Sequence, residues 1–171
     1  MRVIESSNLI LKKPTENDFD LIREILSCPS QTKFLPNEEP YPEEKQREYL
    51  KNRIAHWEKH NFGTFIVSLK GSKGEKVGFA GVEFAPDPQY IDIRFAILRG
   101  FEGQGLATKA SKLVIDYTFS NTNHTKIYGV AMHSNQPSKS VLKKLGMKSE
   151  PKADLYFCKG LDHFSITPSY A

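Results

Sequence analysis

The sequence runs Arg99-Gly100-Phe101-Glu102-Gly103-Gln104-Gly105-Leu106-Ala107-Thr108-Lys109-Ala110 where a strand pattern gives way to a helix pattern. Residues 90–97 alternate between apolar and polar side chains, and residues 104–120 repeat apolar side chains at helical spacing. Glycines between the two patterns allow a tight turn and a close approach of a ligand to the backbone. The first amides of a helix lack partners inside the helix and lie at the positive end of its dipole. This segment is therefore predicted to bind an anion, and a pyrophosphate suits it.

Two other phosphate-binding patterns do not match this segment. A nucleoside-triphosphate loop places Lys and then Ser or Thr directly after its second glycine, but Leu106 follows Gly105 here. The dinucleotide pattern GxGxxG follows a first strand and precedes an acidic residue by about twenty positions. Here the glycines are spaced GxxGxG, the preceding strand is at least the fourth, and residue 125 is Thr. A glycine-rich turn selected only for packing is the remaining alternative.

Turn signals and changes of period divide the rest of the chain into short elements. The expected order is a strand at 9–11, a helix from the N-cap Thr15 to about Ser27, a proline-rich loop at 29–42, a helix at 42–59, strands at 62–69, 76–84 and 90–97, a helix at 104–120, a strand at 126–132, a helix from Ser138 to Leu145 closed by Gly146, and strand-like segments around Tyr156 and Phe164. This order predicts an α/β fold, an α+β sandwich with a mixed, mostly antiparallel central sheet flanked by helices. Residues 1–171 are predicted to form a single domain.

The composition is that of a globular protein, with 39% hydrophobic and 26% charged residues. Apolar runs such as residues 65–69 are too short to cross a bilayer, so no membrane partner is expected. The first residues lack the apolar stretch of a secretory signal. Cys28 and Cys158 have no CxxC spacing and no histidine at metal-ligand spacing, so no metal is expected. Two isolated thiols fit a reducing, cytoplasmic location.

Charge is distributed unevenly along the chain. The formal net charge of +4 combines −1 over residues 1–102 with +5 over residues 103–171. The C-terminal part is therefore expected to face a polyanionic ligand, unless it is simply a solvated basic face. Clustered arginines and interleaved aromatic residues, which are typical of nucleic-acid binding, do not accompany the basic excess. A phosphorylated cofactor suits the charge better than nucleic acid.

Two motifs carry a resemblance to a known superfamily. Residues 103–110 resemble the GxGxAxxA acetyl-CoA loop of the GNAT N-acetyltransferases. Residues 135–147, Asn-Gln-Pro-Ser-Lys-Ser-Val-Leu-Lys-Lys-Leu-Gly-Met, resemble the NxxSxxxxxKLGF signature of the same superfamily. The segments 8–11 and 78–81 match in order, so the resemblance covers nearly the whole chain. The Asn and Ser of the second motif resemble the branch of ribosomal-protein alanine and serine N-acetyltransferases and small-amine acetyltransferases.

The chain departs from the superfamily pattern at two places. Gly100 stands where the acetyl-CoA loop usually has Gln or Arg, with Arg99 one position earlier. Leu142 stands where many members carry a tyrosine acid. The same branch commonly lacks that tyrosine, so these departures leave the identity of the acid open.

The resemblance implies acetyl-CoA as co-substrate, no metal, and direct transfer of the acetyl group from CoA sulfur to a primary amine. It also implies that backbone groups of residues 96–98 pair with pantetheine, that Asn135 hydrogen-bonds the same arm, and that Lys144 reaches the nucleotide phosphates, as Lys109, Lys139 and Lys143 could. The predicted cofactor-binding residues are Ala96, Ile97, Leu98, Gly103, Gln104, Gly105, Leu106, Ala107, Thr108, Asn135 and Lys144.

The attacking amine must lose a proton, since an alkylamine titrates at about 10. Glu83 is the first candidate for the base, because its side chain points away from Val82 and Phe84 toward the expected cleft. Its alternative role is that of a solvent-facing strand residue. Asp92 and His133 are second candidates. The resemblance implies that Ser138 is the hydrogen-bond donor to the thiolate, and this serine also suits the N-cap of the following helix.

The resemblance implies that the acceptor lies against the first two helices and their loop. Glu38, Glu39, Glu43, Glu44 and Glu48 outnumber Lys45 and Arg47 there. This acidic rim would attract a cationic amine, although acidic residues also favour a first helical turn by themselves. The expected partners are an amine-bearing small molecule or a protein N-terminus, and a homodimer is common in the branch. The alternatives are an acyl-CoA-binding module without turnover and a basic nucleic-acid-binding domain.

Overall fold

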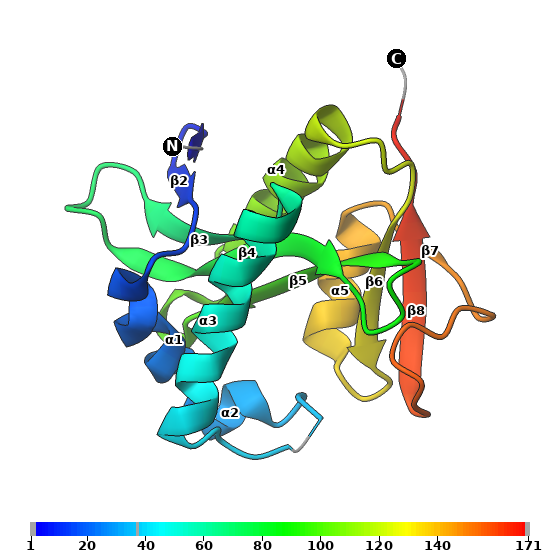
Figure 1. Ribbon diagram of the computed structural model, residues 1–171, viewed down its shortest axis with the longest axis horizontal. Coiled ribbons are helices and arrows are strands. Elements are labelled where there is room, and N and C mark those ends of the chain that lie inside the picture. Colours follow the sequence, from blue (N-terminus) through cyan, green and yellow to red (C-terminus); the bar gives the residue numbers. More distant parts are fainter. Residues whose placement is uncertain (1–2, 37, 170–171) are drawn as a thin grey trace.

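The computed structural model describes residues 3–36 and 38–169, in which one mixed sheet has the strand order β1-β2-β3-β4-β5-β6-β8-β7 (Figure 1). Every neighbouring pair is antiparallel except β5 and β6, which run parallel. The strands are β1 Val3–Glu5, β2 Leu9–Lys12, β3 Thr64–Leu69, β4 Lys76–Phe84, β5 Ile91–Ile97, β6 Ile127–Met132, β7 Lys148–Ser149 and β8 Leu161–Ile166. The mixed, mostly antiparallel sheet predicted from the sequence is confirmed.

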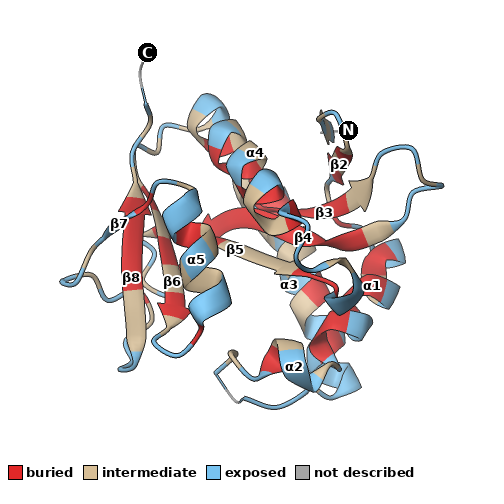
Figure 2. Ribbon diagram, turned by 180° about the vertical axis from the view of Figure 1, so that it is seen from behind, coloured by how far each residue is buried: buried red, intermediate tan, exposed pale blue. Residues whose placement is uncertain are grey.

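Helices cover both faces of this sheet (Figures 1 and 2). The α-helices are α1 Phe19–Leu26, α2 Pro29–Thr32, α3 Glu43–His60, α4 Leu106–Asn121 and α5 Gln136–Lys144, and the 3-10 turns are η1 Glu16–Asp18 and η2 Arg99–Phe101. On one face, α1 and α3 pack against apolar side chains such as Ile66 and Phe79. On the other face, α4 and α5 pack against Val82 and Ile93. Among the described residues, no helix is long and apolar enough to span a membrane.

The parallel pair β5–β6 is short. Its register joins Asp92 to Tyr128 and Ile93 to Gly129, and no pairing follows although both strands continue. A Cβ on Gly129 would lie 2.6 Å from Leu142 Cδ2 and 2.9 Å from Met147 Sδ, so α5 packs closely on β6 at this point. The C-terminal halves of β5 and β6 therefore separate, with α3 on one side of the opening and the start of α4 on the other.

Several expected boundaries differ in the structure. Thr15 is an N-cap as predicted, forming a capping box with Asp18, but the helix from Thr15 to about Ser27 is divided into η1 and α1. The loop at 29–42 contains the one-turn helix α2, in which Pro29 occupies the first position. The start predicted for α4 at Gln104 is two residues early, since Gly103 and Gly105 adopt left-handed turns there.

The C-terminal predictions were less accurate. The strand-like segment around Tyr156 is wrong, because residues 151–160 form turns and bends, whereas the strand around Phe164 is confirmed as β8. The short strands β1 and β7 were not predicted; they have three and two residues, too few for an alternating pattern to be visible. The helix predicted from Ser138 begins at Gln136.

Candidate active site

The glycine-rich turn before α4 is open. Gly103 and Gly105 have φ angles of 80° and 74°, in the left-handed region that favours glycine. A Cβ placed on either residue would meet no atom within 4 Å, so the surface of the turn is free for a ligand. Gly105 is the N-cap of α4 and no side chain caps this end, so the first amides of the helix have no side-chain partner. Residues 103–105 are exposed, while Leu106 points into the core and can offer only its backbone.

The three residues at the end of β5 differ in which backbone groups are free. Leu98 donates its N–H to Val77 O at 2.8 Å and accepts from Phe101 N–H at 2.8 Å, so both of its backbone groups are used. Ile97 points its backbone groups to the opposite edge, toward β6, because directions alternate along a strand. There the side-chain Nε2 of Gln31 donates to Ile97 O at 2.6 Å. Of the predicted residues Ala96, Ile97 and Leu98, Ile97 is the one whose backbone groups face the opening between β5 and β6.

A buried charged cluster lies on the α3 face of the sheet, where β5 and β6 begin to separate. Glu83 and Asp92 are register partners on β4 and β5, and their side chains are each 2% exposed. Arg53 of α3 places Nε 2.8 Å from Glu83 Oε2, and Arg94 places Nη2 3.2 Å from Asp92 Oδ1 and Nη1 3.7 Å from Glu83 Oε1. We name Arg53, Glu83, Asp92 and Arg94 the charged cluster.

Two hydroxyl groups donate hydrogen bonds to the carboxylates of the charged cluster. Thr64 donates its hydroxyl to Glu83 Oε2 at 2.7 Å, and the phenol of Tyr156 donates to Asp92 Oδ2. Burial raises the pKa of Asp92 above its ordinary value, and the nearby negative charge of Glu83 acts in the same direction. Burial and the charge of Asp92 also raise the pKa of Tyr156, so the phenol keeps its proton. The Tyr156 hydroxyl beside the charged cluster is therefore a hydrogen-bond donor to the Asp92 carboxylate and retains its proton.

The structure brings Glu83 and Asp92 together and leaves the other candidate bases and acids elsewhere. Glu83 is buried rather than solvent-facing, which excludes its alternative role. His133 is 80% exposed and pairs with Asp162 at 3.2 Å, with no recorded contact to the charged cluster. Leu142 is 1% exposed in the core, so its position offers no proton.

The N-terminus of α5 differs from the prediction. The N-cap is Asn135, whose Oδ1 accepts from Ser138 N–H at 3.2 Å, so the N-cap role predicted for Ser138 is wrong. Asn135 precedes Gln136 and Pro137, and its short polar side chain satisfies the first turn better than a hydroxyl inside the helix would. The hydroxyl of Ser138 has no partner among residues 3–36 and 38–169, so it can donate to a ligand.

The four lysines predicted near the phosphates have different surroundings. Lys139 binds Asp162 at 2.8 Å and is only 12% exposed, so this ammonium is already paired. Lys109, Lys143 and Lys144 are exposed, and no ion pair is recorded for them within the described part of the chain. Lys109 lies in the first turn of α4, and Lys144 is the last residue of α5.

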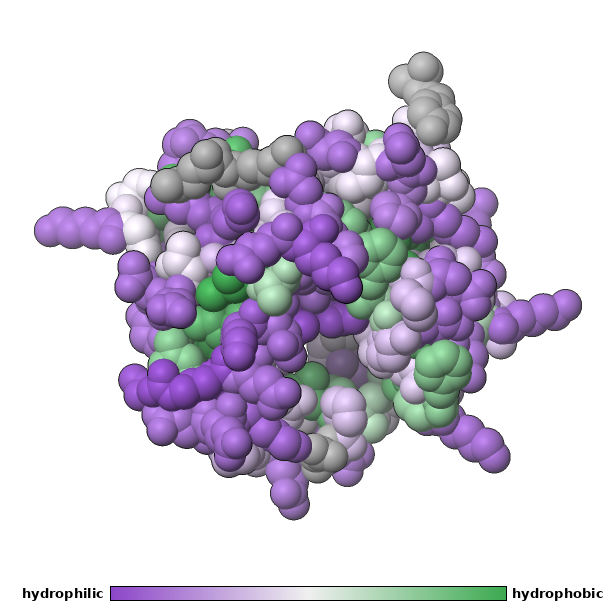
Figure 3. All heavy atoms as spheres, in the orientation of Figure 1, coloured by the Kyte–Doolittle hydropathy of each residue, from purple (hydrophilic) through white to green (hydrophobic). Residues whose placement is uncertain are grey.

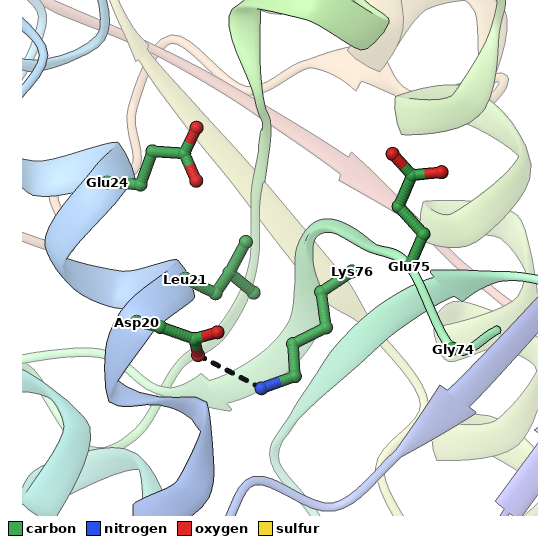
Figure 4. A pocket seen from close by; sticks show the side chains of 6 residues that line it. All are labelled: Asp20, Leu21, Glu24, Gly74, Glu75 and Lys76. Atoms are coloured by element: carbon green, nitrogen blue, oxygen red, sulfur yellow. Dashed lines mark hydrogen bonds and ion pairs between the residues drawn. The ribbon is translucent and has the colours of Figure 1, made fainter.

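Figure 3 shows that the molecule is hollowed on the α3 face, between α3 and α5. A separate polar hollow of about 260 Å³ lies between α1 and the β3–β4 turn (Figure 4), where Lys76 pairs with Asp20 at 3.0 Å. Lys76 begins β4 and Glu83 stands near its other end, so this hollow is remote from the charged cluster. Among the described residues, no three His, Cys, Asp or Glu side chains gather as metal ligands.

The residues of this region that sequence reasoning missed include Arg53, Arg94, Tyr156 and Gln31. Arg94 carried a signal, because it shares a strand face with Asp92 in a strand whose other residues are all apolar. Arg53 carried a weaker one, since it lies near Leu50 and Trp57 at helical spacing on the inner side of α3. Tyr156 and Gln31 belong to a turn region and a one-turn helix, where no periodicity indicates direction.

An open glycine turn at the separation of two parallel strands, in a mixed sheet covered on both faces, defines the GNAT class of acyltransferase folds. A family model described as "Acetyltransferase (GNAT) domain" matches residues 8–148, so the chain belongs to this family. The resemblance drawn from residues 103–110 and 135–147 is thereby confirmed.

Known proteins resemble the chain in sequence and in fold. Spermidine N(1)-acetyltransferase of Escherichia coli (strain K12) is 29% identical over 113 residues, which is 66% of this chain and 59% of that protein, so the match spans less than two thirds of that relative. The structure of an acetyltransferase from Agrobacterium tumefaciens str. C58 matches with a TM-score of 0.88 at 20% identity, over 98% of this chain and 95% of that chain. Ribosomal-protein-S5-alanine acetyltransferase from Vibrio fischeri matches with a TM-score of 0.75 at 18% identity, over 98% and 97%. These structural matches confirm the fold.

Proposed function

We propose that this protein transfers an acetyl group from acetyl-CoA to a primary amine. The observation that carries the proposal is the open turn at residues 103–105, whose unpaired amides begin α4 at the point where β5 and β6 separate. A diphosphate fits such amides because they combine free donors with the positive end of a helix dipole. When bound, acetyl-CoA supplies the thioester carbon that the amine attacks.

Different residues of the chain would bind the pyrophosphate, the nucleotide phosphates and the pantetheine arm of the co-substrate. Backbone amides of residues 103–108 bind the pyrophosphate, and Lys144 lies exposed for the nucleotide phosphates. The open edge at Ile97 pairs with the pantetheine arm, with Gln31 leaving the carbonyl of Ile97 as it binds. The amide group of Asn135, whose oxygen caps α5, keeps its N–H₂ free to donate to the same arm.

We assign proton removal to Glu83. The amine nitrogen forms a bond to the thioester carbon, the bond from carbon to sulfur breaks, and the proton lost by the nitrogen passes through water to the Glu83 carboxylate. Thr64 and Arg53 fix that carboxylate by contacts of 2.7 and 2.8 Å. The departing thiolate receives a hydrogen bond from the Ser138 hydroxyl, which has no other partner in the described part of the chain.

Steady-state release of thiol from acetyl-CoA, measured with a panel of amines and N-terminal peptides, tests this proposal. Glu83→Gln should lower kcat/KM by about 100-fold or more, the usual contribution of a general base. Asp92→Asn is the matched control, because it removes an equally buried carboxylate from the neighbouring strand. CoA binding by both variants should stay close to that of the unmodified protein. Equal losses in both variants would remove Glu83 from the role of base.

A CoA-binding module without turnover is the second candidate, favoured by Gly100 in the acetyl-CoA loop and by the buried Leu142. It predicts heat with CoA in calorimetry and no thiol release above background with any amine. Under that outcome Glu83→Gln would change nothing measurable except stability.

We propose a small amine or a protein N-terminus as the acceptor and a cytoplasmic location. The names of similar proteins indicate spermidine in one case and the N-terminal serine of a ribosomal protein in another. The two cysteines are free thiols, Cys158 being exposed, which suits a reducing cytoplasm.

A further inference from the structure

In the charged cluster, the side chains of the two arginines are more exposed to solvent than those of the two carboxylates. The side chains of Glu83 and Asp92 are each 2% exposed, whereas those of Arg53 and Arg94 are 12% and 24% exposed. A molecule that enters the hollow beside α3 therefore meets guanidinium groups before it meets carboxylates. The formal charges of the two arginines and the two carboxylates also cancel, so the cluster has no net negative charge to attract a further cation.

The two arginines differ in how many of their donors are used. Arg94 directs Nε and Nη2 to Asp92 Oδ1 and donates Nη2 to the carbonyl of Phe84 at 3.1 Å. Arg53 is held at one end: Nε lies 2.8 Å from Glu83 Oε2 as an ion pair without hydrogen-bond geometry, and the guanidinium carbon lies 4.4 Å from the ring centre of Tyr49. Within residues 3–36 and 38–169, no hydrogen-bond acceptor is recorded for Nη1 or Nη2 of Arg53.

A guanidinium fixed in this way is a preformed receptor for an oxyanion. Its two terminal nitrogens form a planar fork that matches the two oxygens of a carboxylate. The Tyr49 ring and the Glu83 contact hold the plane, so little side-chain freedom is lost when the fork is filled. The rim residues Glu38 and Glu39, which are exposed, would attract the ammonium end of the same ligand.

We infer that the acceptor amine carries a carboxylate, which Arg53 binds through Nη1 and Nη2. The inference rests on the proposed acetyl transfer and names its substrate class: an amine with a carboxylate within a few bonds, either a free amino acid or the N-terminus of a peptide with an early acidic residue. A polyamine is the opposite class, because it has no carboxylate for Arg53 to bind and would bring further positive charge beside the two guanidinium groups. Arg53 is on this view a specificity residue that touches the substrate.

Matched acceptors test the inference in the protein as it stands. Thiol release is measured with 5-aminopentanoate against pentylamine, with a Ser-Glu peptide against its Ser-Gln counterpart, and with spermidine. The carboxylate-bearing member of each pair should have a kcat/KM about 10- to 100-fold higher, through a lower KM, since this is the range of one charge-assisted hydrogen-bonded contact. The first pair reports on free amino acids and the second on peptides.

Variants of α3 separate recognition from a purely structural role. In Arg53→Gln the ratio of kcat/KM between matched amines should fall to near one, whatever loss both amines share. Arg53→Lys keeps the charge and should keep part of the preference. Arg47→Gln is the control on the same helix: Arg47 is 62% exposed and pairs with Glu43 at 3.3 Å, so the ratio should not change.

Several outcomes overturn the inference. It fails if spermidine or pentylamine is the better acceptor, or if the ratio is unchanged in Arg53→Gln and Arg53→Lys. Turnover of amines without a carboxylate preference leaves the proposed function standing and removes the inference alone. If no amine is turned over, calorimetry of 5-aminopentanoate and pentylamine with the CoA-bound protein decides, and equal or absent binding removes the inference too. If Arg53→Gln does not fold, the Arg53→Lys ratio decides.

Discussion

Replacement of Gly105 by alanine separates the backbone's role in ligand binding from its role in folding. Gly105 has φ 74° and ψ 12°, a conformation that costs an L-residue about 1 kcal/mol or somewhat more. A Cβ there would meet no atom within 4 Å, so no steric clash adds to this strain. The free energy of unfolding should therefore fall by about 1 kcal/mol, and Tm by about 2–4 °C for a chain of this length.

The effect of Gly105→Ala on the cofactor should be larger than its effect on Tm. A turn that relaxes away from the left-handed region rotates the first amides of α4, and each charge-assisted hydrogen bond lost there is worth about 1.5–3 kcal/mol. We expect the Kd for CoA in calorimetry to rise by about 10- to 100-fold. Pantetheine, which lacks the pyrophosphate, should bind the variant and the unmodified protein equally well.

Gly100→Ala is the matched control for Gly105→Ala. Gly100 belongs to the same segment, a Cβ there would also meet nothing within 4 Å, and its φ lies outside the left-handed region. This variant should keep both Tm and CoA affinity. The reasoning is refuted if Gly105→Ala weakens CoA and pantetheine equally, or if Gly100→Ala weakens CoA as much as Gly105→Ala does.

Three further predictions concern stability. Gly129→Ala should lower the free energy of unfolding by about 1–3 kcal/mol in urea, because its Cβ would lie 2.6 Å from Leu142 Cδ2; an unchanged midpoint would contradict this packing. Asn135→Ala should cost about 1 kcal/mol of thermal stability by removing the cap of α5, whereas Ser138→Ala should cost less than about half of that, and the reverse order would restore Ser138 as the cap. Burial lowers the pKa of His56 below its ordinary 6.5, so the unfolded chain binds the proton first and stability declines as the pH falls below about 6.5. His56→Gln should flatten this decline between pH 8 and 5.5, which Tm measurements at both pH values would detect, and an unchanged slope would assign it to another group.

The parts of the site that were predictable are those made by neighbours in sequence. The turn at residues 103–105 needs only glycines followed by a helix, so a local pattern determines it. The N-cap of α5 is also a local feature, but it was predicted wrongly: Asn135 caps the helix in place of Ser138, and Pro137 in the first turn was a signal that the helix begins before Ser138. Glu83 could be placed on a strand, but its burial depends on Arg53 and Arg94, and no periodicity within β4 reports on those arginines.

The parts that were not predictable join segments far apart in the chain. Gln31 reaches Ile97 across a separation of 66 residues, and Tyr156 reaches Asp92 across 64. Such contacts follow from how the helices and the turns before β8 fold over the sheet, which is decided by packing rather than by propensity. The sequence pattern predicts that Asp92 is a titratable group on a strand, but it does not predict which residues contact Asp92.

The energetic cost of burying the charged cluster favours a role in binding over a role in stability. Two carboxylates opposite each other on adjacent strands repel, and each ion taken out of water costs several kcal/mol that its partner only partly returns. Apolar side chains of the same volume would often serve the fold equally well or better. The charged cluster nevertheless lies where β5 separates from β6: Ile93 is the last residue of β5 that pairs with β6, and Arg94 is the next residue. A costly arrangement at the opening of the sheet is what the proposed site would require in order to bind a charged acceptor and take its proton.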